Sequence, residues 1–404
     1  MMMHYDFDQL FDRTQTQSVK WDYAEAKTGF ADVLPMWVAD MDFMTVPEIG
    51  EALVARARHL AYGYTARSDG YYQSVMDWQV KRNGWSIDKS WITHSSGVVN
   101  AIHTVLRALV RSGEGVLVQP PVYHPFFHAI QQCGGRLVSN PLVLVNGRYE
   151  LDLADFAAKL DLEAPKVFIL CNPHNPVGRV FTREELLAMG NLCLEHGVTV
   201  ISDEIHSDLV YRGHKHIPLP LVSSAFEANT IVCTSASKTF NLAGLATSNI
   251  IIPNRDLRAA FDEAAVRAGS KYFNIFGSVA CEAAYRHGEA WLEQLLDYLE
   301  ANLEYAREYL GKHLPQLSTF KTEGTYFLWV DCRALGLDQT ALERFLLEKA
   351  RLWFNQGHIF GKEGAGFVRI NIACPRSTLE LALSRLQEAI TALAQSSHQA
   401  AGME

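Results

Sequence analysis

The fold of this chain is decided by the stretch TIVCTSASKTFNLAG, residues 230–244. It starts with an apolar, β-branched run, which predicts a buried strand from Thr230 to Cys233. Hydroxyl residues and then Lys238 follow directly. A lysine is costly to bury as a cation, and one that has lost its proton can attack a carbonyl carbon to form a Schiff base. On this stretch alone, a surface lysine on a Ser- and Thr-rich turn is the favoured alternative.

Length and composition are typical of a soluble globular protein with two or three domains. The chain has 404 residues, of which 48% are apolar and 20% charged. Its net charge of −9 argues against nucleic acid as a partner. Seven scattered cysteines without a C-x-x-C pair predict neither a disulfide framework nor a metal site. The polar N-terminus and the absence of any long apolar run predict a cytoplasmic protein without a membrane partner.

Strands and helices alternate through most of the chain. Apolar runs predict strands at residues 91–94, 115–119, 166–171, 198–202, 230–233 and 248–252, with helical periodicity between several of them. This order predicts an α/β fold with a mostly parallel sheet covered on both faces. A helix is expected over 183–197, with Thr182 as its N-cap and Glu185 completing a capping box. One long helical segment is expected at 276–314, and the last helix is expected to be capped by Ser377 with Glu380. The expected domains are an N-terminal arm, 1–46, which joins the small domain, a large domain, 47–285, and a small C-terminal domain, 286–404.

Chemically distinctive residues follow several of these strands. Ser95-Ser96-Gly97-Val98 predicts a turn whose backbone N–H groups can bind an anion, although a simple helix cap is about as compatible. The other strand-end residues are an Asn-Pro loop at 172–178, the acids Asp203 and Glu204, Lys238 and, past a fifth strand, Tyr123. Active sites of open α/β sheets lie at this edge. The combination is far more specific than any one part.

At this point the chain resembles the fold-type I pyridoxal-phosphate enzymes, the aspartate aminotransferase superfamily. The general motifs are the loop CNPHNPVG, Asp203 and the segment SASK that ends at Lys238. Within the superfamily the chain is similar to the MalY/PatB group of cysteine-S-conjugate β-lyases. That narrower resemblance is carried by the segments WDY (21–23), ADMDF (39–43), YGYT (62–65), ISDEIH (201–206), SKTFN (237–241), FVRIN (367–371) and CPR (374–376).

The resemblance implies the fold and the roles of single residues around pyridoxal 5'-phosphate. It implies a large domain with a mostly parallel seven-stranded sheet and a smaller α+β domain. Lys238 is expected to hold the cofactor and to remove the substrate's α-proton. Asp203 is expected beside the pyridine nitrogen, Asn175 at the ring hydroxyl and Tyr123 on the ring face. A helix-capping role is the alternative for Asp203.

The cofactor's phosphate and the substrate's carboxylate have their own expected ligands. The resemblance assigns the phosphate to Gly97, Val98, Ser235 and Ser237, and to Tyr64 of a second subunit, which implies a homodimer with shared active sites. Arg369 is expected to bind the α-carboxylate of an amino-acid substrate as a bidentate fork; a surface arginine is the alternative.

Two positions depart from the superfamily's pattern. Many members carry an arginine a few residues past the lysine, but residues 239–254 contain neither Lys nor Arg. Phosphate binding must then depend more on hydroxyl and N–H donors. Many members also have a tyrosine three residues after the aspartate, where this chain has His206. We assign no role to His206.

The implied activity is α,β-elimination of L-cystathionine or other S-substituted cysteines to pyruvate, ammonia and a thiol. An aminotransferase on the same fold is the first alternative, and nothing in the residues excludes it on physical grounds. The second is an enzyme-like protein with a regulatory binding role, since the β-lyase group includes members with a regulatory partner. Lys238, Asp203 and Arg369 together favour retained chemistry. The sequence does not identify the physiological substrate.

Overall fold

The computed structural model describes residues 4–270 and 273–401. The chain forms two compact units. The first comprises Met44–Leu296 and Thr322–Thr325, and the second comprises His4–Phe43, Asp297–Lys321 and the chain from Tyr326 onward. These bounds differ from the expected large domain, 47–285, and small domain, 286–404, at each junction. Helix α12 (Glu289–His313) contributes residues to both units.

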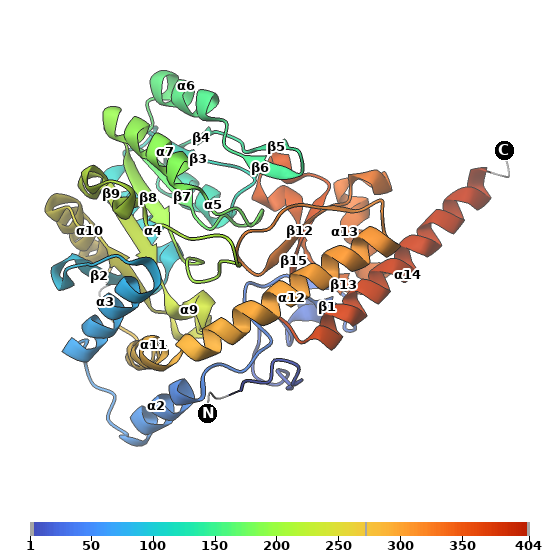
Figure 1. Cartoon of the computed structure of the whole chain (residues 1–404), viewed down its shortest axis with the longest axis horizontal. Helices are drawn as coiled ribbons and strands as arrows, with labels where there is room; N and C mark the ends of the chain where they lie inside the picture. The colour runs from blue at the N-terminus through green and yellow to red at the C-terminus, as the bar shows by residue number, and fades with distance from the viewer. Residues whose placement is uncertain (1–3, 271–272, 402–404) are drawn as a thin grey trace. The chain divides into compact units, whose positions relative to one another are not determined.

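A seven-stranded sheet forms the centre of the first unit (Figure 1). Its strand order is β2-β10-β9-β8-β7-β3-β4, with bounds β2 (Ile92–Ser95), β10 (Ser248–Ile251), β9 (Thr230–Thr234), β8 (Thr199–Asp203), β7 (Val167–Cys171), β3 (Gly115–Val118) and β4 (Arg136–Ser139). Strand β10 runs antiparallel to both of its neighbours. The adjacent pairs from β9 to β4 are parallel. The mostly parallel sheet expected from the sequence is therefore confirmed.

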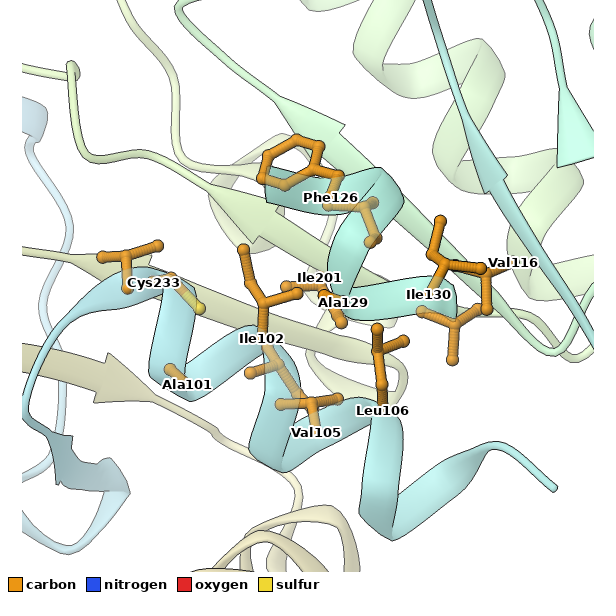
Figure 2. Packing of buried hydrophobic residues seen from close by; sticks show 14 of the residues in the cluster. Ala101, Ile102, Val105, Leu106, Val116, Phe126, Ala129, Ile130, Ile201 and Cys233 are labelled. Atoms are coloured by element: carbon orange, nitrogen blue, oxygen red, sulfur yellow. The ribbon is translucent and has the colours of Figure 1, made fainter. Parts of the chain in front are cut away.

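Helices bury both faces of this sheet. On one face the apolar sides of α4 (Val98–Leu109), α5 (Pro125–Gln132) and α10 (Arg255–Arg267) pack on Val116, Ile201 and Cys233, as Figure 2 shows for α4 and α5. Side chains alternate along a strand, so the intervening residues face the other way. There Phe168 contacts Phe156 of α6 (Leu153–Glu163), with ring centroids 5.1 Å apart. Both faces are apolar because both are covered.

The first unit contains further α-helices. They are α2 (Pro47–Arg58), α3 (Asp69–Asn83), α7 (Arg183–Glu195), α8 (Leu219–Val222), α9 (Ala236–Thr239) and α11 (Ile275–His287). The sequence did not indicate β4, α5 or α10. Thr182 and Glu185 form the capping box predicted for α7, which confirms that helix start. A small hairpin, β5 (Val143–Val145) and β6 (Arg148–Glu150), completes the unit.

Two helix predictions are wrong in detail. The segment expected as one helix over 276–314 is divided into α11 and α12 at Gly288. A Cβ built at Gly288 would lie 2.2 Å from Phe240 Cε1, so the close approach of this distant ring requires glycine there. Helix α14 (Arg376–Ala401) already includes Ser377. Ser377 is therefore inside the helix and does not cap it.

The second unit contains a smaller, antiparallel sheet with the order β11-β12-β15-β14. The strands are β11 (Ser318–Thr319), β12 (Phe327–Asp331), β15 (Phe367–Asn371) and β14 (Asn355–Gln356). A separate pair joins β1 (Leu34–Pro35) to β13 (Leu352–Trp353), and the other helices are α1 (Ala24–Thr28), α13 (Gln339–Glu348) and α14. Within residues 4–270 and 273–401, no helix is both long and apolar enough to cross a membrane.

Candidate active site

The ends of three neighbouring parallel strands bring the predicted residues of the first unit to one edge of the sheet. In β8, Asp203 is the last residue, and it pairs in register with Cys171 of β7 and Cys233 of β9. The Asn175 loop follows β7, and Lys238 follows β9 on the short helix α9. Because parallel strands end together, residues separated by more than 60 positions are collected at this edge.

Asp203 is buried in an environment that disfavours its charge. Burial raises the pKa of the Asp203 carboxyl to about 7, and the nearby Glu204 also raises it. Two features act in the opposite direction: Ile205 N donates a 3.2 Å hydrogen bond to Asp203 Oδ1, and the charge of Lys238 favours the carboxylate. A further cation at this carboxyl would favour its ionised form.

The two residues that follow Lys238 are held in place by hydrogen bonds. Thr239 Oγ1 donates a 2.8 Å hydrogen bond to Asp208 Oδ2, and Trp78 Nε1 donates to the same carboxylate at 3.1 Å. All three of these supporting side chains are buried. One residue further on, Thr45 Oγ1 donates to the carbonyl of Phe240 at 2.7 Å. The sequence provided no signal for Asp208, because its partners lie on distant segments.

The two serines predicted at the phosphate have different surroundings. Ser235 is the N-cap of α9: its hydroxyl accepts from Ser237 N at 3.0 Å and donates to Thr247 O at 2.7 Å. A hydroxyl has one proton, so Ser235 would have to release Thr247 to donate to a phosphate. Ser237 is only half-buried. Ser237 is therefore the better candidate of the two for a direct contact.

Gly97 and Val98 lie where α4 begins. No side chain caps this helix, and Gly97 is extended, with φ 169°. A Cβ at Gly97 would meet nothing within 4 Å, so the protein itself leaves space there. The first N–H groups of a helix are donors without intrahelical partners and favour an anion. The turn has the chemistry that a phosphate requires.

Asn175 and Tyr123 flank this edge from two other loops. Asn175 is buried, and its backbone N–H points to Cys171 Sγ at 3.5 Å. Tyr123 is half-buried and packs against the core, with its ring 5.7 Å from Phe126. Asn172 has a structural role instead, since its Oδ1 accepts from Phe181 N at 3.1 Å.

Glu204 follows Asp203 but belongs to a separate buried pair. Its carboxylate lies 2.8 Å from His216 Nε2 and accepts from the hydroxyl of Ser202, also at 2.8 Å. The backbone N–H of Leu219 donates to it at 3.3 Å. Glu204 is therefore paired and buried rather than solvated. His216 was not anticipated from the sequence.

Tyr64 and His206 differ sharply in exposure. Tyr64 is 97% exposed within this chain. In the same segment, the ring centroid of Tyr62 lies 5.9 Å from that of Phe276. His206 is buried, three residues after Asp203.

Arg369 belongs to the second unit and is buried there in β15. Its Nη2 donates to the carbonyl of Trp37 at 3.0 Å and to Asn355 Oδ1. The guanidinium carbon lies 4.0 Å from the ring centroid of Phe327 and 4.9 Å from that of Phe360. Because Arg369 is buried, the alternative interpretation of it as a surface arginine is wrong.

The residues of the first unit fit pyridoxal phosphate by their chemistry. Anion-binding N–H groups lie at Gly97, a buried carboxylate at Asp203 and a primary amine at Lys238. Each of these groups can bind one part of the cofactor. The N–H groups suit its phosphate, the carboxylate suits its pyridine nitrogen, and the amine suits its aldehyde. Among the residues that the structure describes, no group of three or more His, Cys, Asp or Glu could hold a metal ion.

Comparisons with known proteins identify the family. Residues 31–386 match the model for aminotransferase class I and II. The chain is 43% identical to cystathionine β-lyase PatB of Bacillus subtilis, over 96% of this chain and 100% of that protein. A PLP-bound protein from Clostridium difficile 630, provisionally named an aminotransferase, superposes with a TM-score of 0.94 at 45% identity, covering 96% of this chain and 100% of that one.

Cystalysin from Treponema denticola, which contains pyridoxal 5'-phosphate, also superposes with a TM-score of 0.94. It is 35% identical, and the match covers 97% of this chain and 100% of that chain. The aspartate-aminotransferase-like fold expected from the sequence is confirmed. With its seven-stranded sheet and its match over most of its length, the chain belongs to the aminotransferase class I and II family.

Proposed function

We propose that this chain is a pyridoxal-phosphate-dependent carbon–sulfur β-lyase. Its substrates are L-cystathionine and other S-substituted cysteines, and its products are pyruvate, ammonia and a thiol. The observation that carries the proposal is the arrangement of Asp203, Lys238 and the Asn175 loop at one sheet edge, in a chain 43% identical to a cystathionine β-lyase.

The cofactor is pyridoxal 5'-phosphate, which when bound withdraws electrons from the substrate's Cα and so makes its proton removable. In our proposal Asp203 holds a positive charge at the ring nitrogen. Asn175 would hold the cofactor at its ring hydroxyl oxygen, and Tyr123 would hold it at one ring face. The N–H groups of Gly97 and Val98 and the hydroxyl of Ser237 hold the phosphate, with Ser235 supporting Ser237 through the N-cap.

Lys238 is the proposed general base. Its amine takes the proton from Cα of the substrate, after which the C–S bond at Cβ breaks and the sulfur leaves as a thiolate. The Thr239–Asp208 hydrogen bond keeps the helix that carries this amine in place. For cystathionine the overall balance consumes one water and yields homocysteine, pyruvate and ammonia.

Arg369 is the proposed ligand of the α-carboxylate. A guanidinium presents a planar fork of donors that matches a carboxylate. The substrate is thereby recognised as an amino acid.

The proposed assembly is a homodimer in which Tyr64 serves the phosphate of the partner's site. The support is the chemistry of the segment: in the single chain a tyrosine is 97% exposed, with Leu60 and Tyr62 exposed beside it. Exposed apolar and aromatic side chains grouped in this way are typical of an interface.

A product assay tests the activity. Purified holoenzyme mixed with L-cystathionine should release pyruvate, ammonia and homocysteine in equal amounts, with no 2-oxo acid added. Lys238→Ala should lower kcat by about a hundredfold to ten-thousandfold, the usual contribution of a general base.

The other outcomes separate the alternatives. Strict dependence on an added 2-oxo acid, with no pyruvate formed from cystathionine, would identify an aminotransferase, as the name of the Clostridium difficile protein suggests. Bound cofactor without turnover of any amino acid would point to a regulatory role. Full activity of Lys238→Ala would refute the proposed mechanism.

A further inference from the structure

Strand pairing places Asn355 beside Arg369. Arg369 lies in β15, between β12 and β14, and its direct partner in β14 is Asn355. Directly opposed residues of antiparallel strands project from the same face of a sheet. The two side chains are therefore neighbours because of the register, although 14 positions separate them in the sequence.

Two aromatic rings restrict how the guanidinium can move. The rings of Phe327 and Phe360 lie within 4.0 Å and 4.9 Å of its central carbon. Contacts of this kind favour a guanidinium that stays against the aromatic faces. They do not select the direction in which the donors of the fork point, because an aromatic face offers no acceptor with a fixed position.

Two oxygen atoms with fixed positions accept hydrogen bonds from one end of the fork. Nη2 of Arg369 donates to the carbonyl of Trp37 and to Oδ1 of Asn355. A guanidinium only donates hydrogen bonds, so the amide of Asn355 must turn its oxygen toward it. Both of these acceptors of Nη2 are neutral oxygens.

The segment that follows Trp37 is itself held in place from β15. Two residues after Arg369, Asn371 Nδ2 donates at 2.6 Å to the carbonyls of Val38 and of Asp40. The loop that follows Trp37 is thus fixed to the strand that carries Arg369. Asn355 is the one side-chain acceptor among the two contacts of Nη2, and it can be changed without altering the backbone.

We propose that Asn355 is a positioning residue for the substrate's carboxylate. Its neutral side-chain oxygen helps to hold the Arg369 fork in the orientation that binds the carboxylate of an incoming amino acid. This inference rests on the proposed role of Arg369 and extends it to specificity: Asn355 contributes to the preference for an α-amino acid over an amine that lacks the carboxylate.

The test compares two probes on the purified holoenzyme. The absorbance of the bound cofactor is titrated with L-alanine, which has no leaving group at Cβ, and with ethylamine, which lacks the carboxylate. Asn355→Asp adds a negative charge at nearly constant shape, whereas Asn355→Ala removes the acceptor. Asn355→Asp should raise the Kd for L-alanine by about tenfold or more, and Asn355→Ala should raise it by about threefold to tenfold. Changes of this size are on the scale of a charge-assisted hydrogen bond. The Kd for ethylamine should change by less than about twofold, because its binding does not use the fork.

Gln356→Glu is the matched control. Gln356 is the next residue of β14 and is buried, whereas Asn355 is half-buried, and consecutive side chains of a strand point to opposite faces. The control adds a similar charge to the same strand away from Arg369, and it should leave the ratio of the two Kd values unchanged. If Asn355→Asp does not fold, Asn355→Ala and Asn355→Ser carry the test alone.

Three results would overturn the proposal. These are an unchanged Kd ratio in the Asn355 variants, equal weakening of both probes, and a wild-type protein that does not prefer alanine to ethylamine. The titration requires no elimination. A wild-type protein that releases no pyruvate but whose Kd ratio depends on residue 355 would therefore refute the proposed lyase activity and leave the positioning role supported.

Discussion

At the scale of single residues, Asp203 and Glu204 show how differently two adjacent acids can be used. Glu204 has three donors, from His216, Ser202 and Leu219, and is fully satisfied inside the protein. Asp203 has one backbone donor and a pKa of about 7, raised mainly by burial. A buried carboxyl of this kind is stabilised in its charged form by a bound cation, and the pyridine nitrogen of the cofactor supplies one.

The raised pKa predicts a pH dependence for the cofactor-free protein. Asp203 is protonated in the folded state up to about pH 7, but in the unfolded chain it ionises near its ordinary value of 3.8. The folded state then binds more protons between these limits, so this carboxyl lowers the free energy of unfolding as the pH rises. Relative to Asp203→Asn, the wild-type apoprotein should lose on the order of a few kcal/mol between about pH 4 and pH 7.

Urea unfolding of both apoproteins at several pH values measures this difference. Wild type and Asp203→Asn that keep a constant difference across the range would contradict the prediction. The holoenzyme should show a smaller pH dependence, because the cofactor's cation favours the carboxylate.

At the scale of elements, the short helix α9 is held by tertiary contacts rather than by its own hydrogen bonds. Four residues are too few for a stable isolated helix. The hydroxyl of its C-terminal residue, Thr239, donates a hydrogen bond to the carboxylate of Asp208, which also accepts hydrogen bonds from Trp78. Arg82 Nε lies 3.6 Å from the same carboxylate. These contacts connect the residue after Lys238 to helix α3.

Removal of the Thr239 hydroxyl tests this connection. Thr239→Val keeps the shape but leaves the buried carboxylate of Asp208 with one donor fewer, and it should lower the free energy of unfolding by about 1–3 kcal/mol. Lys238 is then less well placed, so kcat should fall more than KM changes. Denaturant unfolding and steady-state kinetics measure the two effects. Thr239→Ser should restore most of both, and a Thr239→Val protein with wild-type stability and kcat would show that the hydrogen bond is dispensable.

At the scale of the whole molecule, chain order and compact units do not coincide. Thr322–Thr325 belong to the first unit although the chain on either side belongs to the second. The N–H groups of Glu323 and Gly324 both donate to Gly178 O, at 2.7 Å and 3.0 Å, and the buried Glu323 carboxylate pairs with Arg179. This short segment therefore holds the end of the loop that carries Asn175.

The proposed homodimer predicts complementation between two impaired variants. Lys238→Ala lacks the base, and Tyr64→Ala lacks the proposed phosphate contact to the partner. In a mixed dimer one site combines both defects and the other has neither. Random pairing on co-expression should therefore restore wild-type activity to about a quarter of the sites. Activity no higher than the sum of the two variants expressed separately would contradict shared active sites.

Much of the fold and of the candidate site was determined by the sequence itself. Apolar runs, turn residues and helix signals act over a few positions, so they predicted the parallel strands, the capped start of α7 and the special residues at the strand ends. Lys238 and Asp203 could be singled out because each follows a buried strand directly. Parallel strands bring such positions together whatever the details of packing.

Only the tertiary structure decided which partner each side chain finds. The Ser235 hydroxyl bonds to Thr247 O, and Phe240 approaches so closely that only glycine fits at 288, where the segment expected to be one helix is divided. Asp208 lies 31 positions from Thr239, and Asn355 faces Arg369 only through the strand register. A hydrogen bond or a close contact depends on separations of a few tenths of an ångström between segments far apart in the chain, and these separations are set by packing of the whole fold.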